Sequence, residues 1–150
     1  MRPRTALPLA IGGCLAMAAA VGIGRFLYTP ALPLMGAEAG LGPQAAGWVA
    51  SANFAGYLAG ALIAALPGFS ARARAWMAAA LALSALTTAL MAATHAPLAW
   101  ALLRFAGGMA SAFVLVFASA LVTARLKAGG QGQLTSVHFA GVGLGIFLSA

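Results

Sequence analysis

Acidic residues are almost missing from this sequence, and charge of either sign is scarce. Of 150 residues, 6% are charged and 63% are hydrophobic, and Glu38 is the single acid. A soluble domain carries about 25% charged residues, so this chain has too little polar surface to face water. Because a bilayer suits such a composition, the sequence predicts an integral membrane protein.

Other absences narrow the possible functions. One cysteine, Cys14, excludes an intrachain disulfide and a cysteine-rich metal site, and two histidines with one acid are too few for a metal centre. The chain has no glycine-rich phosphate loop, so an ATP-driven pump is unsupported. The eight basic residues are dispersed in pairs instead of forming a cluster, which argues against a nucleic-acid partner. We therefore expect no cofactor, no metal and no nucleic acid.

Long apolar runs organise the chain. Runs of spanning length, about 20 residues, lie at 7–35, 45–66, 75–94, 97–124 and 134–150, and turn residues separate them. We expect an all-α, multi-pass helical bundle with five transmembrane helices and with Glu38 in an outer loop. The last run has no glycine stop and no basic last turn. Residues 1–150 are therefore expected to be an amino-terminal fragment, a partial transmembrane half-domain.

The basic residues predict an orientation. Six of the eight occupy the amino terminus and every second loop, namely Arg2, Arg4, Arg72, Arg74, Arg125 and Lys127. The alternate loops hold no Lys or Arg. Positive charge concentrates on the cytoplasmic side of membrane proteins, so we expect a cytoplasmic amino terminus.

Two arginines remain inside apolar runs. An Arg at the bilayer centre costs about 2.5–3.5 kcal/mol on insertion scales. At 1.5 Å per residue, Arg25 lies about 15 Å from the outer side, Arg104 about 10 Å and Asn53 about 12 Å, so the three share a layer. With the only acid assigned to a loop, their partners are carbonyls, Asn53, tyrosines, water, acids outside this sequence or an entering anion.

The layer permits two interpretations. Tyr57 stands one turn beyond Asn53, and Tyr28 one turn beyond Arg25, so the first, second and fourth helices can present polar groups to a common wet cavity. The predicted substrate-binding residues are Arg25, Tyr28, Asn53, Tyr57 and Arg104, and the predicted ligand is a small polar or anionic solute. The alternative is that an arginine is a structural clamp on carbonyls.

Stripes of small residues predict close helix packing. The second run carries Ala52, Gly56, Gly60 and Ala64 at four-residue spacing, and the last run has Gly141 and Gly145. The run 75–94 has no charge and no glycine, which suits a peripheral, lipid-facing helix.

His138 is a candidate for proton coupling because imidazole titrates near neutral pH; a packed, hydrogen-bonded histidine is the alternative. Ser111 and His138 could also approach each other inside a core of about 30 Å. However, the serine has no Gly-x-Ser-Gly setting and no carboxylate orients the histidine. An intramembrane serine hydrolase is therefore a remote alternative, and we expect no enzyme.

Several motifs resemble one family. "GIGRFLYTPALPLM", "SANFAGYLAGAL", "RFAGGMASAFVLVFAS" and "HFAGVGLGI" are similar to the YbfB/YjiJ-type transporters of the major facilitator superfamily, over essentially the whole chain. The spacing of Arg104 and Gly108 also matches the superfamily's arginine–glycine motif in the fourth helix.

The resemblance implies a fold and a mechanism. The fold would have twelve helices in two six-helix halves that give alternating access, so the missing carboxy-terminal half would be a partner. Helices 1 and 4 would line the cavity, with Arg104 tied to substrate or proton coupling. The implied function is secondary transport of a small polar or anionic solute, coupled to an ion such as the proton, in the bacterial inner membrane.

Some features depart from the family pattern. The segment "ALPGFSARARAW" keeps Arg72 and Arg74 but lacks the aspartate of the usual gating motif. The fifth helix lacks the full glycine–proline pattern of antiporters, so antiport is not implied. The alternative function is a small multi-span scaffold or subunit without transport activity.

Overall fold

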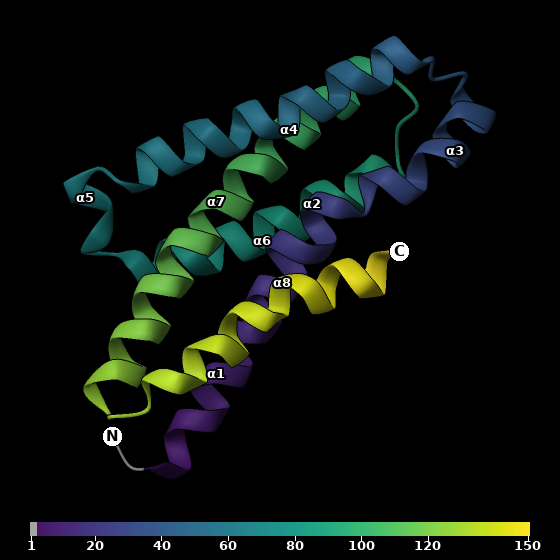
Figure 1. Cartoon of the computed structure of the whole chain (residues 1–150). Coiled ribbons are helices and arrows are strands. Elements are labelled where there is room, and N and C mark those ends of the chain that lie inside the picture. The colour runs from purple at the N-terminus through teal and green to yellow at the C-terminus, as the bar shows by residue number, and fades with distance from the viewer. Residues whose placement is uncertain (1–2) are drawn as a thin grey trace.

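The chain forms a bundle of helices that run between two ends of the molecule (Figure 1). This computed structural model describes residues 3–150, with side chains from Thr5 onward. The elements in chain order are α1 (Pro3–Met17), the π-helical segment η1 (Ala18–Ile23), α2 (Gly24–Phe26), α3 (Tyr28–Ala39), α4 (Pro43–Ala64), α5 (Pro67–Ser70), α6 (Ala73–Met91), α7 (Pro97–Ala128), the 3-10 turn η2 (Gly132–Leu134) and α8 (Thr135–Ser149). The described residues contain no strand, which confirms the all-α class.

Four helical segments are long and apolar enough to cross a membrane. They are Thr5–Ala39, Pro43–Ala64, Ala73–Met91 and Pro97–Ala128. The predicted fifth run corresponds to α8, which has 15 residues and is not among these four segments. Helices therefore occupy all five predicted runs, and four of them have spanning length.

The end of the first helix differs from the prediction. We expected a loop from Gly36 onward with Glu38 in it, but α3 continues to Ala39 and Glu38 lies on its last turn. Alanine and glutamate favour helix, and the helix ends only where Gly40 adopts a left-handed conformation with φ 64°. Glu38 is exposed there.

The first spanning segment is interrupted twice. In η1 the N–H of Gly24 bonds to the carbonyl of Ala19, five residues earlier, so one extra residue is inserted in the turn. Leu27 then separates α2 from α3. Pro30 follows closely and has no N–H to donate to the carbonyl of Phe26. These irregularities surround Gly24 and Arg25.

Glycines bring two pairs of helices into close contact. On α4, a Cβ at Gly56 would collide with the main chain of Phe105 on α7, and one at Gly60 would approach the Met109 carbonyl. On α8, a Cβ at Gly141 would collide with the Cys14 carbonyl of α1. The predicted small-residue stripes therefore serve helix packing.

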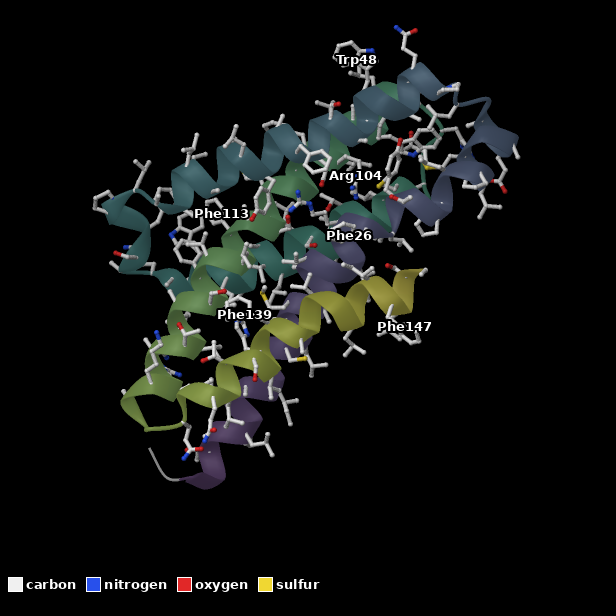
Figure 2. The ribbon with its side chains drawn as sticks, in the orientation of Figure 1. Phe26, Trp48, Arg104, Phe113, Phe139 and Phe147 are labelled. Carbon is white, nitrogen blue, oxygen red and sulfur yellow. The ribbon has the colours of Figure 1, made fainter. Side chains whose placement is uncertain are left out.

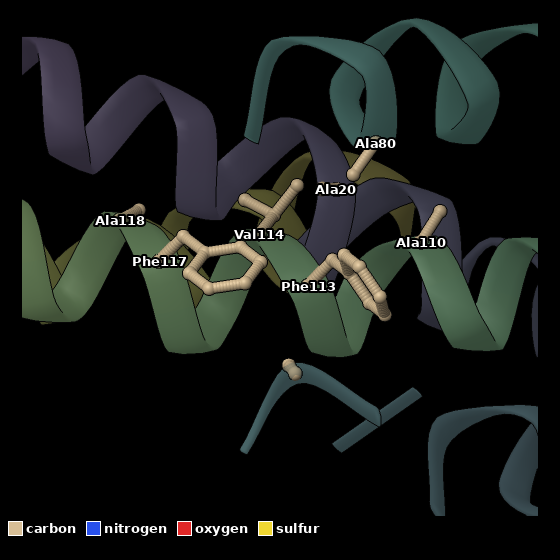
Figure 3. Close-up of a cluster of buried hydrophobic side chains, with 8 residues drawn as sticks. Ala20, Ala80, Ala110, Phe113, Val114, Phe117 and Ala118 are labelled. Atoms are coloured by element: carbon tan, nitrogen blue, oxygen red, sulfur yellow. The ribbon is translucent and has the colours of Figure 1, made fainter. Parts of the chain in front are cut away.

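The core lies along α7, and Phe113 and Phe117 pack edge to face at its centre. Figure 3 shows this cluster, whose members are Ala20, Ala64, Ala80, Ala110, Phe113, Val114, Phe117 and Ala118. α6 packs on α7 and leaves Leu86 55% exposed on its far side. A peripheral position for this helix agrees with its composition.

The described basic residues other than Arg25 and Arg104 lie at one end of the bundle. The start of α1, α5 and the connection between α7 and α8 are on the left in Figure 1, and the connections from α3 to α4 and from α6 to α7 are on the right. Arg72, Arg74, Arg125 and Lys127 are exposed at the left end. Arg2 and the side chain of Arg4 lie outside the described residues.

Candidate functional site

Arg104 binds the main chain of the first spanning segment. Its side chain is 6% exposed on α7, and its Nη1 donates to the Gly24 carbonyl at 2.9 Å while Nη2 donates to the Arg25 carbonyl at 2.6 Å. The guanidinium carbon lies 5.0 Å from the ring centroid of Tyr28. Arg104 therefore has the geometry of a clamp on carbonyls.

This arrangement solvates a buried charge without an acid. Carbonyl oxygens have two lone pairs, so each can accept a bond from the arginine as well as a main-chain bond. The planar guanidinium reaches two carbonyls at once, and the Tyr28 ring adds a cation–π contact. Nε of Arg104 is buried and has no hydrogen-bond partner in the described part of the chain.

Asn53 and Tyr28 tie α4 into the same layer. Nδ2 of Asn53 donates to the main-chain carbonyl of Arg104 at 3.0 Å, and Asn53 is 2% exposed. The hydroxyl of Tyr28 donates to the Ala46 carbonyl at 2.9 Å. The amide of Asn53 thus holds the backbone of α7 and does not meet a guanidinium.

The side chain of Arg25 lies against aromatic residues of α4. Its guanidinium carbon lies 4.3 Å from the ring centroid of Tyr57, 5.0 Å from that of Phe54 and 5.9 Å from that of Phe26. Within residues 5–150 the structure gives this half-buried guanidinium no acid and no hydrogen-bond acceptor. Its contacts are cation–π contacts, and its N–H donors are free to bind another group.

Both arginines lie near the middle of the bundle. Figure 2 places Arg104 between α4 and the first segment, with Phe26 beside it. The structure thus brings together the predicted layer of Arg25, Tyr28, Asn53, Tyr57 and Arg104. Their binding of a substrate remains a prediction.

A cavity of about 300 Å³ lies beside this layer, between α3, the end of α6 and the start of α7. Its walls are mainly apolar, and Tyr28 and Arg104 contribute polar groups at depth. Glu38 and His95 also line it. Arg25, Asn53 and Tyr57 are not among its lining residues, so the five predicted site residues do not surround one cavity in this conformation.

His138 is fully buried at 0% exposure between α8 and its neighbours. Its Nε2 lies 3.3 Å from the hydroxyl of Ser119, and a Cβ on Gly13 of α1 would collide with its Nδ1. The ring also interacts with the main chain of Gly13. One titratable ring therefore sits at the junction of α1, α7 and α8.

The serine next to His138 is not the one that the sequence suggested. The hydroxyl of Ser111 donates to the Gly108 carbonyl of its own helix at 2.8 Å. Antiparallel neighbours lie at similar distances from the turn that joins them, and Ser119 is nearer to that turn than Ser111. Counting residues from the turn therefore indicates Ser119 as the neighbour of His138, and the sequence alone was enough to find it.

The comparisons with known proteins bear on this site. No curated protein and no solved structure matches the chain. The family model described as "Uncharacterised MFS-type transporter YbfB" matches residues 17–150, which contain Arg25, Arg104 and His138. This match spans most of the sequence and agrees with its apolar helices. The chain is a membrane protein and belongs to the YbfB family of MFS-type transporters.

Proposed function

We propose that this chain supplies part of the amino-terminal half of a secondary transporter, in which Arg25 binds a small polar or anionic solute. The observation that carries the proposal is the state of Arg25. Its guanidinium lies in a spanning segment, with three aromatic rings around it and no acid or acceptor in the described residues. Ionisable groups inside a membrane are expensive and usually functional.

The two arginines take different roles in this proposal. Both Nη atoms of Arg104 are occupied by carbonyls, so Arg104 is a positioning residue that holds the segment bearing Arg25. Asn53 holds the backbone of Arg104, and Tyr28 lies against its guanidinium. Arg25 and Tyr57 then contact the solute.

The coupling ion in the proposal is the proton, and His138 carries it. Its imidazole is buried, interacts with the Gly13 main chain and lies near Ser119. A protonatable ring at a junction of three helices can link protonation to their packing.

The proposed location is the bacterial inner membrane, with a cytoplasmic amino terminus. Support comes from the exposed basic residues, which lie at one end of the bundle, as the positive-inside rule requires. In this arrangement a carboxy-terminal half of the same protein completes the alternating-access fold.

The test is transport by the full chain that the gene encodes, reconstituted in proteoliposomes and offered a panel of organic anions, amino acids and sugars. We expect Arg25→Ala to abolish uptake of the transported solute while membrane insertion stays near normal. Arg25→Lys should also fail, since an ammonium group cannot replace a planar fork.

Arg125→Ala is the matched control, because it removes the same charge from an exposed position at the end of the bundle. Its uptake should equal that of the unmodified chain. Unchanged uptake in Arg25→Ala would contradict the assignment of Arg25.

A further inference from the structure

We infer that the solute bound at Arg25 is a monocarboxylate with an apolar, preferably aromatic, body. This inference rests on the proposed function and names the substrate class of that same site. It follows from the number of cationic groups without a hydrogen-bond acceptor at the site, from the shape of the guanidinium and from the rings that surround it.

Arg25 is the one described arginine at this depth whose side chain has no hydrogen-bond acceptor. Arg104 lies in the same layer, but its two Nη atoms bind the carbonyls of Gly24 and Arg25. The described basic residues outside this layer are exposed at the end of the bundle. Arg25 can pair directly with one carboxylate group, whereas the second charged group of a dianion would meet an Arg104 already bound to carbonyls. The number of unpaired cationic groups therefore favours a monoanion.

The geometry of Arg25 favours a planar oxyanion. Its guanidinium carbon lies over the Tyr57 ring, 4.3 Å from the ring centroid. The edges of the guanidinium still carry N–H donors in a fixed fork. A carboxylate matches this fork with two parallel hydrogen bonds, so a carboxylate fits the free edge.

The surroundings of the guanidinium favour an apolar body. Phe54 and Phe26 flank it and are 61% and 37% exposed. The three rings around Arg25 offer one polar atom, the Tyr57 hydroxyl, which is too few to recognise a sugar by its hydroxyls. A carboxylate held by Arg25 instead places its substituent over aromatic carbon, where offset and edge-to-face ring contacts are favourable.

Binding of five probes to the full chain in lipid nanodiscs tests the inference. Benzoate carries one charge and a ring, acetate lacks the ring, terephthalate and phenyl phosphate carry more charge, and benzamide is neutral. We expect benzoate to bind at least about tenfold more tightly than each of the others, measured by calorimetry.

Variants connect this selectivity to the named residues. Arg25→Ala and Arg25→Gln should lose benzoate binding, and circular dichroism with gel filtration checks that they fold. Phe54→Ala should weaken benzoate binding and leave acetate unchanged. Phe147→Ala is the matched control, because it removes a 78% exposed ring from α8 and should bind benzoate normally.

The outcomes separate the inference from the proposed function. Equal affinity for terephthalate and benzoate, or benzoate binding that survives Arg25→Ala, would overturn the inference. If proteoliposomes show Arg25-dependent transport of a solute that is not a monocarboxylate, the inference fails and the proposed function stands. If no solute shows Arg25-dependent transport, the proposed function fails too.

Discussion

Nη2 of Arg104 donates a hydrogen bond to the main-chain carbonyl of Arg25 at 2.6 Å, so one intramembrane arginine fixes the backbone of the other. The side chain of Arg25 leaves this point in another direction and lies over Tyr57. The two cations are therefore linked through the backbone while their guanidinium groups meet different partners. This relationship gives Arg104 a positioning role and Arg25 a binding role. The positioning role can be tested by measuring the stability of Arg104 variants.

Replacing Arg104 should destabilise the bundle. Arg104→Ala removes two hydrogen bonds from a charged donor, each worth about 1.5–3 kcal/mol. Arg104→Lys keeps the charge but not the fork, so it should fall between the alanine variant and the unmodified chain. Thermal unfolding in detergent measures the order. Arg125→Ala, exposed near the end of the same helix, is the control, and equal melting temperatures for it and Arg104→Ala would contradict the clamp.

Replacement by alanine should have opposite effects on stability at two glycines of α8. A Cβ at Gly141 collides with the Cys14 carbonyl of α1, so Gly141→Ala should cost about 1–3 kcal/mol by overpacking. Gly143 has no atom within 4 Å of the added Cβ, and Gly143→Ala should be neutral or slightly stabilising because alanine favours helix. Melting temperatures of the two variants check this. The packing assignment is wrong if Gly143→Ala is the less stable variant.

His138 should govern the pH dependence of transport. In the unmodified chain, uptake driven by a proton gradient should vary with pH as His138 gains and loses a proton. His138→Gln should remove this dependence and gradient-driven accumulation, while solute exchange without a gradient continues. His95→Gln, an exposed histidine, should behave as the unmodified chain does. An unaltered pH profile in His138→Gln would assign this histidine to packing.

The orientation can be checked with single cysteines in a Cys14→Ala background. Gly42 follows α3 and Ala71 follows α5, and both are exposed at opposite ends of the bundle. In intact cells, an impermeant maleimide should label Gly42→Cys and should not label Ala71→Cys. The reverse pattern would place the amino terminus outside.

Hydropathy was sufficient to predict the helical class and the positions of the spanning helices. It was insufficient for the end of the first helix, which depends on the helix preference of individual residues. The helix continues past Gly36 through Glu38 and ends at Gly40. The glycine stripes predicted close packing correctly, because a residue without a side chain lets the backbone of a neighbouring helix approach. Gly56 against Phe105 is such a case.

The partners of the two arginines were harder to predict. A carbonyl oxygen exists at every residue, so the sequence names no particular acceptor for Arg104, and the choice of Gly24 depends on tertiary packing. Cation–π contacts of Arg25 with Tyr57 likewise depend on how α4 lies beside the first segment. The layer was predictable from helix rise, whereas the division of roles within it required the structure.

The π-helical segment Ala18–Ile23 sets the direction in which Arg25 points. In an unbroken α-helix, Cys14 and Arg25 would lie about three full turns apart and share one side. α1 meets the glycines of α8 at Cys14, so Arg25 would then face α8 as well. The inserted residue turns everything after it by about 100°, and Arg25 reaches α4 instead. The one residue inserted in this turn therefore decides that the Arg25 guanidinium contacts α4 and not α8.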